Sequence, residues 1–213
     1  MTNTQDKSKL YGGPDLKYQR AKKGTEHMID IERSYMFGEK RSTTVTAGQP
    51  KRFTGGVHEL LGTGGSFVQN QGGVLTAPDF NNFLREGFTY GNPQKVLMAG
   101  GYVLQAVNEF ARGQLQTQVG SSKYGLAISK YQTPFGEINI VHNPLFIGDV
   151  AGYAYLLDLE SFRSRYLDGR DTSLKMNIQA NDVDGRVDEY LSECGLERKQ
   201  APRHALLKGV LPS

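Results

Sequence analysis

The sequence predicts a mixed α+β protein in which strands and helices do not alternate regularly. Three observations indicate this class: one long helical segment near the start, later segments with the two-residue alternation of strands, and turn residues that join those strands directly. The 213 residues are enough for one large domain, or for two small domains that share a core. The single Cys194 excludes an intramolecular disulfide framework.

Residues 14–38 are predicted to form a helix of about 36 Å. Pro14 and Asp15 suit its first turn, and Gly38 can adopt the left-handed conformation that ends a helix. Gly24 weakens this helix by about 1 kcal/mol relative to alanine. Its apolar stripe is only roughly periodic and consists of Leu16, Ala21, Met28, Ile31 and Tyr35. Because the helix is as long as a small domain is wide, we expect part of it to lie along a surface or another subunit.

The middle of the chain contains a glycine-rich stretch followed by a second helix. Residues 41–73 are predicted to be loop and short extended pieces, because Gly-Gly pairs begin at positions 55, 64 and 72. The start signal at residues 76–79 then predicts a helix that ends at Gly91. Its apolar face has helical spacing and contains Phe80, Phe83, Leu84 and Phe88.

The next segments predict a buried strand, a third helix and a hairpin. Residues 95–100 are a short apolar run typical of a buried strand, and the helix after it is predicted to end at Gly113. Residues 125–143 carry the clearest strand signal. Two β-rich runs flank a turn at residues 133–136, which predicts a long hairpin.

The C-terminal part is predicted to consist mainly of strands. An apolar strand is expected to end near Asp158 and to be followed by a short turn or helix. Residues 174–179 alternate as a half-buried strand does, and residues 181–185 form a polar turn. Residues 187–199 and 204–210 are expected to form two more strands, joined across Ala201 and Pro202.

The charge is unevenly distributed along the chain. Residues 1–52 contain eleven Lys and Arg against six Asp and Glu, whereas the rest contains fourteen against sixteen. A basic N-terminal part is compatible with binding to a polyanion such as nucleic acid. It is equally compatible with a solvated helix face, because Glu26, Asp30 and Glu32 lie among the basic residues. No run approaches the roughly 18 apolar residues of a membrane span, so no membrane partner is expected.

No pattern indicates catalysis. The four histidines are scattered without metal-ligand spacing, and residues 62–67 lack the lysine and spacing of a phosphate-binding loop. A calcium loop around Asp182 and Asp184 would have too few oxygen ligands, because its first and twelfth positions are Ala180 and Leu191. We therefore expect no enzyme activity, no metal and no cofactor.

Five stretches, in this order, resemble the conserved words of a family of tailed-phage major head proteins. They are IERSYMFGEK at 31–40, RFTGG at 52–56, YQTPFGEINIVHNPLF at 131–146, YAYLLDLESFRSRYLDGRD at 153–171 and DGRVDEYLSECGLERKQAPRHALLKGV at 184–210. The similarity begins near Leu10 and spans nearly the whole chain. That family has the Hong Kong 97-type capsid fold, which it shares with bacterial encapsulins.

The resemblance implies a long spine helix, at residues 14–38, within a peripheral domain. It implies that residues 1–75 hold this helix and the glycine-rich loop, that residues 76–158 form an axial domain, and that residues 159–213 return to the peripheral domain. It further implies a non-enzymatic protein that assembles into hexamers and pentamers of an icosahedral shell around double-stranded DNA. The expected location is the virion, after assembly in the host cytoplasm, with scaffold, portal or decoration proteins as further partners.

In such a shell the spine helix would run along the inner wall, so its basic residues are expected to face packaged DNA. These residues are Lys17, Arg20, Lys22 and Lys23. Two alternatives are a basic, sequence-independent nucleic-acid-binding domain and an encapsulin-like compartment shell. Family members carry an N-terminal arm and an extended loop before the spine helix, but only about a dozen residues precede Pro14 here. A fragment or a reduced member is therefore expected, without the longest-reaching interfaces of such shells.

Overall fold

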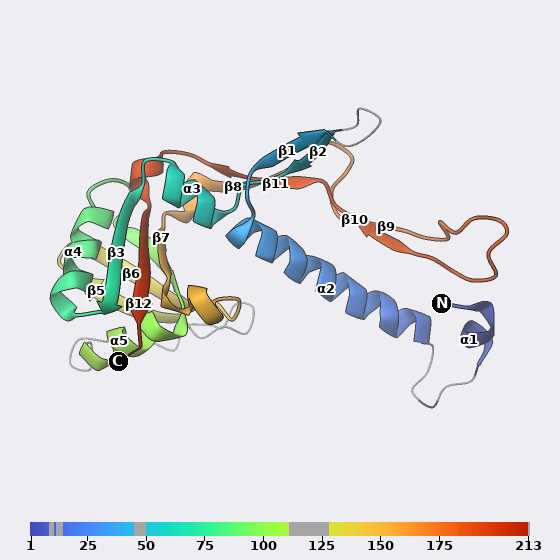
Figure 1. Cartoon of the computed structure of the whole chain (residues 1–213), viewed down its shortest axis with the longest axis horizontal. Coiled ribbons are helices and arrows are strands. Elements are labelled where there is room, and N and C mark those ends of the chain that lie inside the picture. The colour runs from blue at the N-terminus through green and yellow to red at the C-terminus, as the bar shows by residue number, and fades with distance from the viewer. Residues whose placement is uncertain (9–10, 12–14, 45–49, 111–127, 213) are drawn as a thin grey trace. The chain divides into compact units, whose positions relative to one another are not determined.

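The computed structural model of the chain contains two compact units (Figure 1). Unit 1 consists of Met1–Gly56 and Ser164–Glu197, and unit 2 consists of Val57–Arg163 and Arg198–Ser213. The structure describes every residue except 9–10, 12–14, 45–49, 111–127 and 213. Among the helices of the described residues, none combines the length and the apolar character that crossing a membrane requires.

Unit 2 is built on a six-stranded mixed sheet with the strand order β3-β12-β7-β4-β6-β5. The strands are β3 (Phe67–Val74), β4 (Gln94–Ala99), β5 (Ile128–Thr133), β6 (Gly136–His142), β7 (Ala154–Leu157) and β12 (Ala205–Leu211). Strands β3 and β12 are parallel, as are β4 and β6, and the other neighbours are antiparallel. The mixed pairing confirms the predicted α+β class.

Helices α3 (Val57–Thr63), α4 (Ala77–Gly87) and α5 (Gly101–Phe110) belong to the same unit, with short 3-10 helices η1 (Gly148–Gly152), η2 (Leu159–Ser161) and η3 (Ala201–Arg203). Helix α4 begins as predicted, because the Thr76 hydroxyl accepts a hydrogen bond from the Asp79 N–H and a proline follows the cap. Its apolar face packs into one core with residues from all six strands, to which β3 contributes the partly buried Phe67. The fully buried members include Phe80, Phe83, Leu84, Leu97, Ile138 and Leu207.

Unit 1 contains α1 (Asn3–Lys7), α2 (Asp15–Phe37) and two small antiparallel hairpins. One hairpin pairs β1 (Arg41–Thr44) with β2 (Pro50–Phe53), and the other pairs β9 (Ser173–Lys175) with β10 (Glu189–Leu191). A further two-stranded sheet consists of β8 (Phe162–Tyr166) and β11 (Cys194–Arg198), the strands in which the chain passes between the units. Among the described residues of unit 1, Met36 is the only apolar side chain that is buried.

Most predicted elements are confirmed, with nearly the expected ends. They are the long helix, the buried strand β4, the β5–β6 hairpin, and β7 followed by η2. The predicted start at Pro14 and the predicted helix end at Gly113 lie outside the described residues.

Three predictions are wrong in detail. Residues 41–73 contain the predicted short extended pieces, β1 and β2, but also the helix α3 and most of the eight-residue strand β3, which were not predicted. Residues 187–199 form two short strands, β10 and β11. Of the predicted strand at 174–179, only Leu174 and Lys175 lie in a strand, β9. The third error is the end of α4, which lies at Gly87 instead of Gly91.

The structure gives a physical reason for the early end of α4. A side chain at Gly87 would lie 2.5 Å from Leu156 Cδ2, so the glycine is needed for close packing on the sheet. The Lys95 ammonium donates to the carbonyl oxygens of Gly87 and Tyr90, at 2.6 and 2.7 Å, and so satisfies groups that would otherwise continue the helix. Gly91 lies in the following turn with φ of +96°.

Candidate functional site

One face of α2 packs against the β9–β10 hairpin and the residues that follow it, mainly through polar contacts. The Tyr190 hydroxyl donates to the Arg20 carbonyl oxygen at 3.0 Å, and the His27 and Tyr190 rings stack with centroids 5.9 Å apart. His27 Nε2 lies 2.8 Å from the Ser192 hydroxyl. A side chain at Gly24 would lie 3.1 Å from the Tyr190 hydroxyl oxygen, so this glycine permits the close approach.

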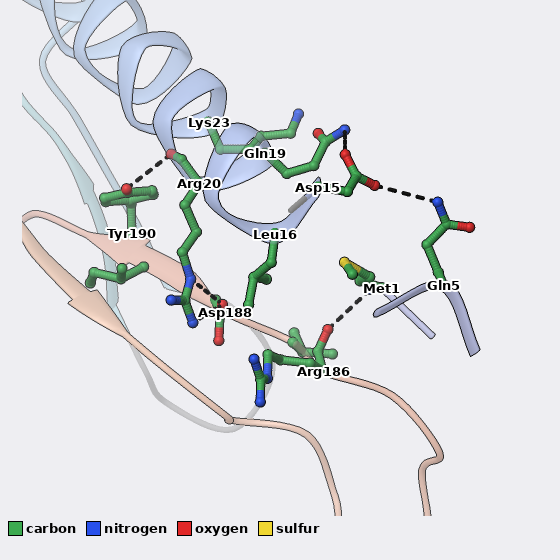
Figure 2. A pocket seen from close by; sticks show the side chains of 12 residues that line it. Met1, Gln5, Asp15, Leu16, Gln19, Arg20, Lys23, Arg186, Asp188 and Tyr190 are labelled. Atoms are coloured by element: carbon green, nitrogen blue, oxygen red, sulfur yellow. Dashed lines mark hydrogen bonds and ion pairs between the residues drawn. The ribbon is translucent and has the colours of Figure 1, made fainter. Parts of the chain in front are cut away.

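A cavity of about 450 Å³ lies between α1, the first turns of α2 and the β9–β10 hairpin (Figure 2). The chain start is tied to its wall, because the Met1 ammonium donates to the Arg186 carbonyl at 3.0 Å and the Arg186 N–H donates to the Met1 carbonyl at 2.8 Å. The apolar part of the lining comes from Met1, Leu16, Leu174, Val187 and Tyr190. The polar part comes from Gln5, Asp15, Gln19, Arg20, Lys23, Arg186 and Asp188.

The structure separates the four predicted DNA-facing residues into two pairs. Arg20 and Lys23 line the cavity, and both are ion-paired: Arg20 with Asp188 at 2.8 Å and Lys23 with Glu26 at 2.6 Å. The other two, Lys17 and Lys22, are exposed and make no ion pair with any residue that the structure describes. Of the four predicted residues, only Lys17 and Lys22 therefore lack an ion pair within the described part of the chain, and the charge of Lys22 acts on nearby Glu26.

The Arg20–Asp188 ion pair binds the β9–β10 hairpin to α2. The Asn177 N–H donates to the Asp188 carboxylate at 3.0 Å, and Arg20 donates at 2.8 Å. These bonds, first that of Asn177 and then that of Arg20, hold the pKa of Asp188 below its usual value. Because Asp188 is largely enclosed while Arg20 is only partly exposed, the pair fixes geometry more than it provides a free charge.

The residues around the cavity hold structural elements together. Its central cation and carboxylate form an ion pair, which Figure 2 shows as a dashed line between Arg20 and Asp188. Within the described ranges, no group of three or more His, Cys, Asp or Glu side chains could hold a metal ion. The arrangement positions the chain start and the hairpin on the long helix.

Sequence reasoning found the helix but missed its partners. Asp188, Tyr190 and Ser192 lie more than 160 positions from the helix residues that they contact. One signal was available: a glycine inside a helical pattern, here Gly24, can indicate close approach of another element. It shows where a partner packs, but it does not identify that partner.

The outer face of α2 differs from the predicted apolar stripe. Leu16, Ile31 and Tyr35 are half-buried as the stripe requires, but Ala21 and Met28 are exposed. The apolar side chains that project outward are Tyr18, Met28 and Ile29, with 64%, 51% and 40% of their surface exposed. The apolar residues of this helix are thus divided between two faces.

Comparison with known proteins identifies a capsid lineage. The sequence profile described as SU10 major capsid protein matches residues 1–211. No curated protein sequence matches the chain. The fold is similar to a chain of the "Satellite phage P4 procapsid including size determination (Sid) protein", with a TM-score of 0.56 and 14% identity over 99% of this chain and 71% of that one.

A second solved structure, the "virus-like particle from Pyrococcus furiosus", has a TM-score of 0.41 and 14% identity over 71% of this chain and 58% of its own. At 14% identity, the procapsid match indicates a shared fold. The profile match is a separate observation, based on sequence, and it extends through both units. The chain belongs to the SU10 major capsid protein family.

Proposed function

We propose that the protein is the major subunit of a tailed-phage head, with a Hong Kong 97-type capsid fold in which α2 is the spine helix. Family membership makes it a structural, capsid-forming protein of the virion. The proposed assemblies are hexamers and pentamers that close into an icosahedral shell around double-stranded DNA. Host cytoplasm is the proposed site of assembly, and scaffold, portal or decoration proteins are proposed further partners.

In this proposal, unit 1 is the peripheral domain and unit 2 is the axial domain. The predicted axial range 76–158 lies wholly inside unit 2. The predicted ranges 1–75 and 159–213 are each divided by unit boundaries, after Gly56 and around Ser164–Glu197. Strand β12 joins the sheet of unit 2, so the proposed peripheral domain receives only the segment Ser164–Glu197 from the C-terminal part.

The observation that carries the proposal is the scarcity of buried apolar side chains in unit 1. Helix α2 is 23 residues long, yet Met36 is its only buried residue. A unit with so small a core gains little stability from its own packing, and exposed apolar side chains on a long helix are typical of an interaction surface. Copies of the same chain can cover this surface in a closed symmetric assembly.

Self-assembly is the first expected result. The purified protein should elute from size-exclusion chromatography as large species and show rings or shells by negative-stain microscopy. Ile29→Asp should remove these species, because it places a charge on the exposed apolar face of α2, whereas Asn81→Asp, at an exposed position of α4, is the control. A folded wild-type protein that stays monomeric at high concentration, also when supplied with the arm segment of a relative, would contradict the proposal.

Binding of DNA to the exposed lysines of α2 is the second expected result. The double variant Lys17→Gln/Lys22→Gln should bind duplex DNA more weakly and reduce the slope of log K against log salt by about 1.8, since each neutralised phosphate contributes about 0.9. The matched double variant Lys130→Gln/Lys175→Gln removes the same charge elsewhere and should leave the slope unchanged. Fluorescence anisotropy at several salt concentrations measures both.

An unchanged slope in Lys17→Gln/Lys22→Gln would show that these lysines are only solvated. Arg20→Gln should mainly loosen the hairpin, because Arg20 is already paired with Asp188. Salt-dependent DNA binding without any assembly would favour the alternative of a nucleic-acid-binding domain. Shells that exclude DNA would favour the alternative of an encapsulin-like compartment.

A further inference from the structure

The β1–β2 hairpin is a ribbon with unbalanced positive charge. It carries Arg41, Lys51 and Arg52 and contains no Asp or Glu in either strand. All three cations are exposed, and they form no ion pair with another described residue. Arg41 lies opposite Phe53 in the register, and the Phe53 ring is 56% exposed. Since side chains alternate between the two faces of a strand, Arg41 and Lys51 lie on the same face as Phe53, and Arg52 lies on the other. One face of the ribbon therefore presents two cations beside an uncovered aromatic ring.

The outer part of the loop that closes the β9–β10 hairpin, before Arg186, has the opposite character. This acidic tip, residues 176–184, carries Asp182 and Asp184 and no Lys or Arg. The Asp184 carboxylate accepts from the Asn3 amide, whereas Asp182 contacts no cation among the described residues. Three apolar side chains in the tip are about half exposed, namely Met176, Ile178 and Val183. The tip therefore presents carboxylates beside uncovered apolar groups.

The ribbon and the acidic tip belong to opposite ends of α2. The ribbon follows the C-terminal end of the helix, where the Gly56 N–H donates to the Gly38 carbonyl at 2.7 Å. The β9–β10 hairpin is bound at Arg20, near the N-terminal end, by Asp188 and Tyr190. About 26 Å of helix separates Arg20 from Phe37. This separation exceeds the Debye length of about 8 Å at physiological salt, so the two charged regions of one copy do not compensate each other.

We propose that the ribbon of one copy binds the acidic tip of a second copy. The inference rests on the proposed self-assembly and names a contact that would produce it. Opposite charge fixes the pairing, and the Phe53 ring packs against apolar side chains of the tip. Because the two surfaces are different parts of the chain, the contact is head to tail, and repetition around an axis closes a ring.

Reciprocal charge reversal tests the pairing. Arg41→Glu/Lys51→Glu makes the face of the ribbon that carries Phe53 acidic, and Asp182→Lys/Asp184→Lys makes the tip basic. Each variant alone should reduce assembled material by about tenfold or more, because like charges then face each other. All four changes in one chain should restore assembly. An equimolar mixture of the two variants should also assemble, as each reversed surface meets its complement in alternating copies.

Each outcome is decisive when circular dichroism shows that the variants are folded. The control Lys7→Glu/Arg163→Glu reverses two exposed charges elsewhere and should assemble normally. Single variants that assemble like the wild type, or a four-fold variant that stays dispersed, would overturn the pairing while leaving self-assembly intact. A ribbon variant that assembles but loses duplex-DNA binding would assign the ribbon to DNA instead. Failure of the wild type to assemble would overturn both this contact and the proposed function.

Discussion

Replacing Lys95 with methionine is expected to lower the free energy of unfolding by about 3 kcal/mol or more. The Lys95 side chain is only 1% exposed, and its ammonium donates to the carbonyl oxygens of Gly87, Tyr90 and Arg203 at 2.6, 2.7 and 2.6 Å. Methionine fills much of the same volume but donates no hydrogen bond. Buried carbonyl groups at the end of α4 and in η3 would lose their partner.

The loss of stability should arise where the Lys95 ammonium binds its three carbonyl partners. Gly87 ends α4, Tyr90 lies in the turn after it, and Arg203 precedes β12. The ammonium therefore joins three segments of the chain. Urea unfolding followed by circular dichroism measures the change, and hydrogen exchange of the β4 amides locates it. Lys130→Met is the matched control, because the Lys130 side chain is 44% exposed and forms an ion pair with Glu137. Equal stability of the two variants would show that the buried ammonium is not a structural anchor.

The pH dependence of the free energy of unfolding distinguishes the effect of the Lys95 charge from the effect of its packing. Burial lowers the pKa of this lysine to about 8, while Asp158 opposes the shift and Arg203 adds to it. The unfolded chain then binds more protons than the folded chain between pH 8 and the ordinary lysine value of about 10.4. Stability should therefore rise with pH in this window in the wild type, and this component should be absent in Lys95→Met.

The sequence predicted elements whose signals are local. Helix α4 has its cap, proline and apolar face within a dozen residues, and the β5–β6 hairpin has its turn between two β-rich runs. Strand β3 has no such signal, because Gly72 and Gly73 interrupt its alternation. It is a strand because β12 pairs with it in parallel, and the register shift between Lys208 and Val210 accommodates its irregular end.

Only part of the candidate site could be predicted from the sequence, because its contacts join residues that are far apart in the chain. The basic residues of α2 can be read from the sequence, but the partner of Arg20 is 168 positions away. Without that partner, Arg20 and Lys17 look equivalent, although one is paired and one is not. Lys95 is a similar case: its strand was predicted, whereas its bond to the Arg203 carbonyl, 108 positions away, depends on the sheet topology. Long-range pairing decides which charges are free.

Acid is expected to destabilise the protein through His204, by about 3 kcal/mol between neutral pH and pH 4. The His204 ring is completely buried and lies 4.6 Å from the Phe162 ring, measured between centroids. Its Nδ1 accepts a hydrogen bond from the Asp158 N–H at 3.2 Å. Nε2 therefore carries the proton and faces the Lys199 carbonyl at 3.4 Å. A second proton on Nδ1 would oppose the Asp158 N–H inside the core.

Burial is the main reason that the pKa of His204 falls to about 4, since Lys95 and Arg198 add to the shift while Lys199 and Asp158 oppose it. An unfolded histidine titrates near 6.5, so between pH 6.5 and 4 the unfolded state binds more protons. Stability is thus complete above 6.5 and is lost as pH falls toward 4. His204→Asn keeps an acceptor near the Asp158 N–H but cannot titrate. Although less stable at pH 7, this variant should lose about 3 kcal/mol less than the wild type on acidification, as measured by urea unfolding. Parallel losses in the two proteins would assign acid sensitivity to the carboxylates instead.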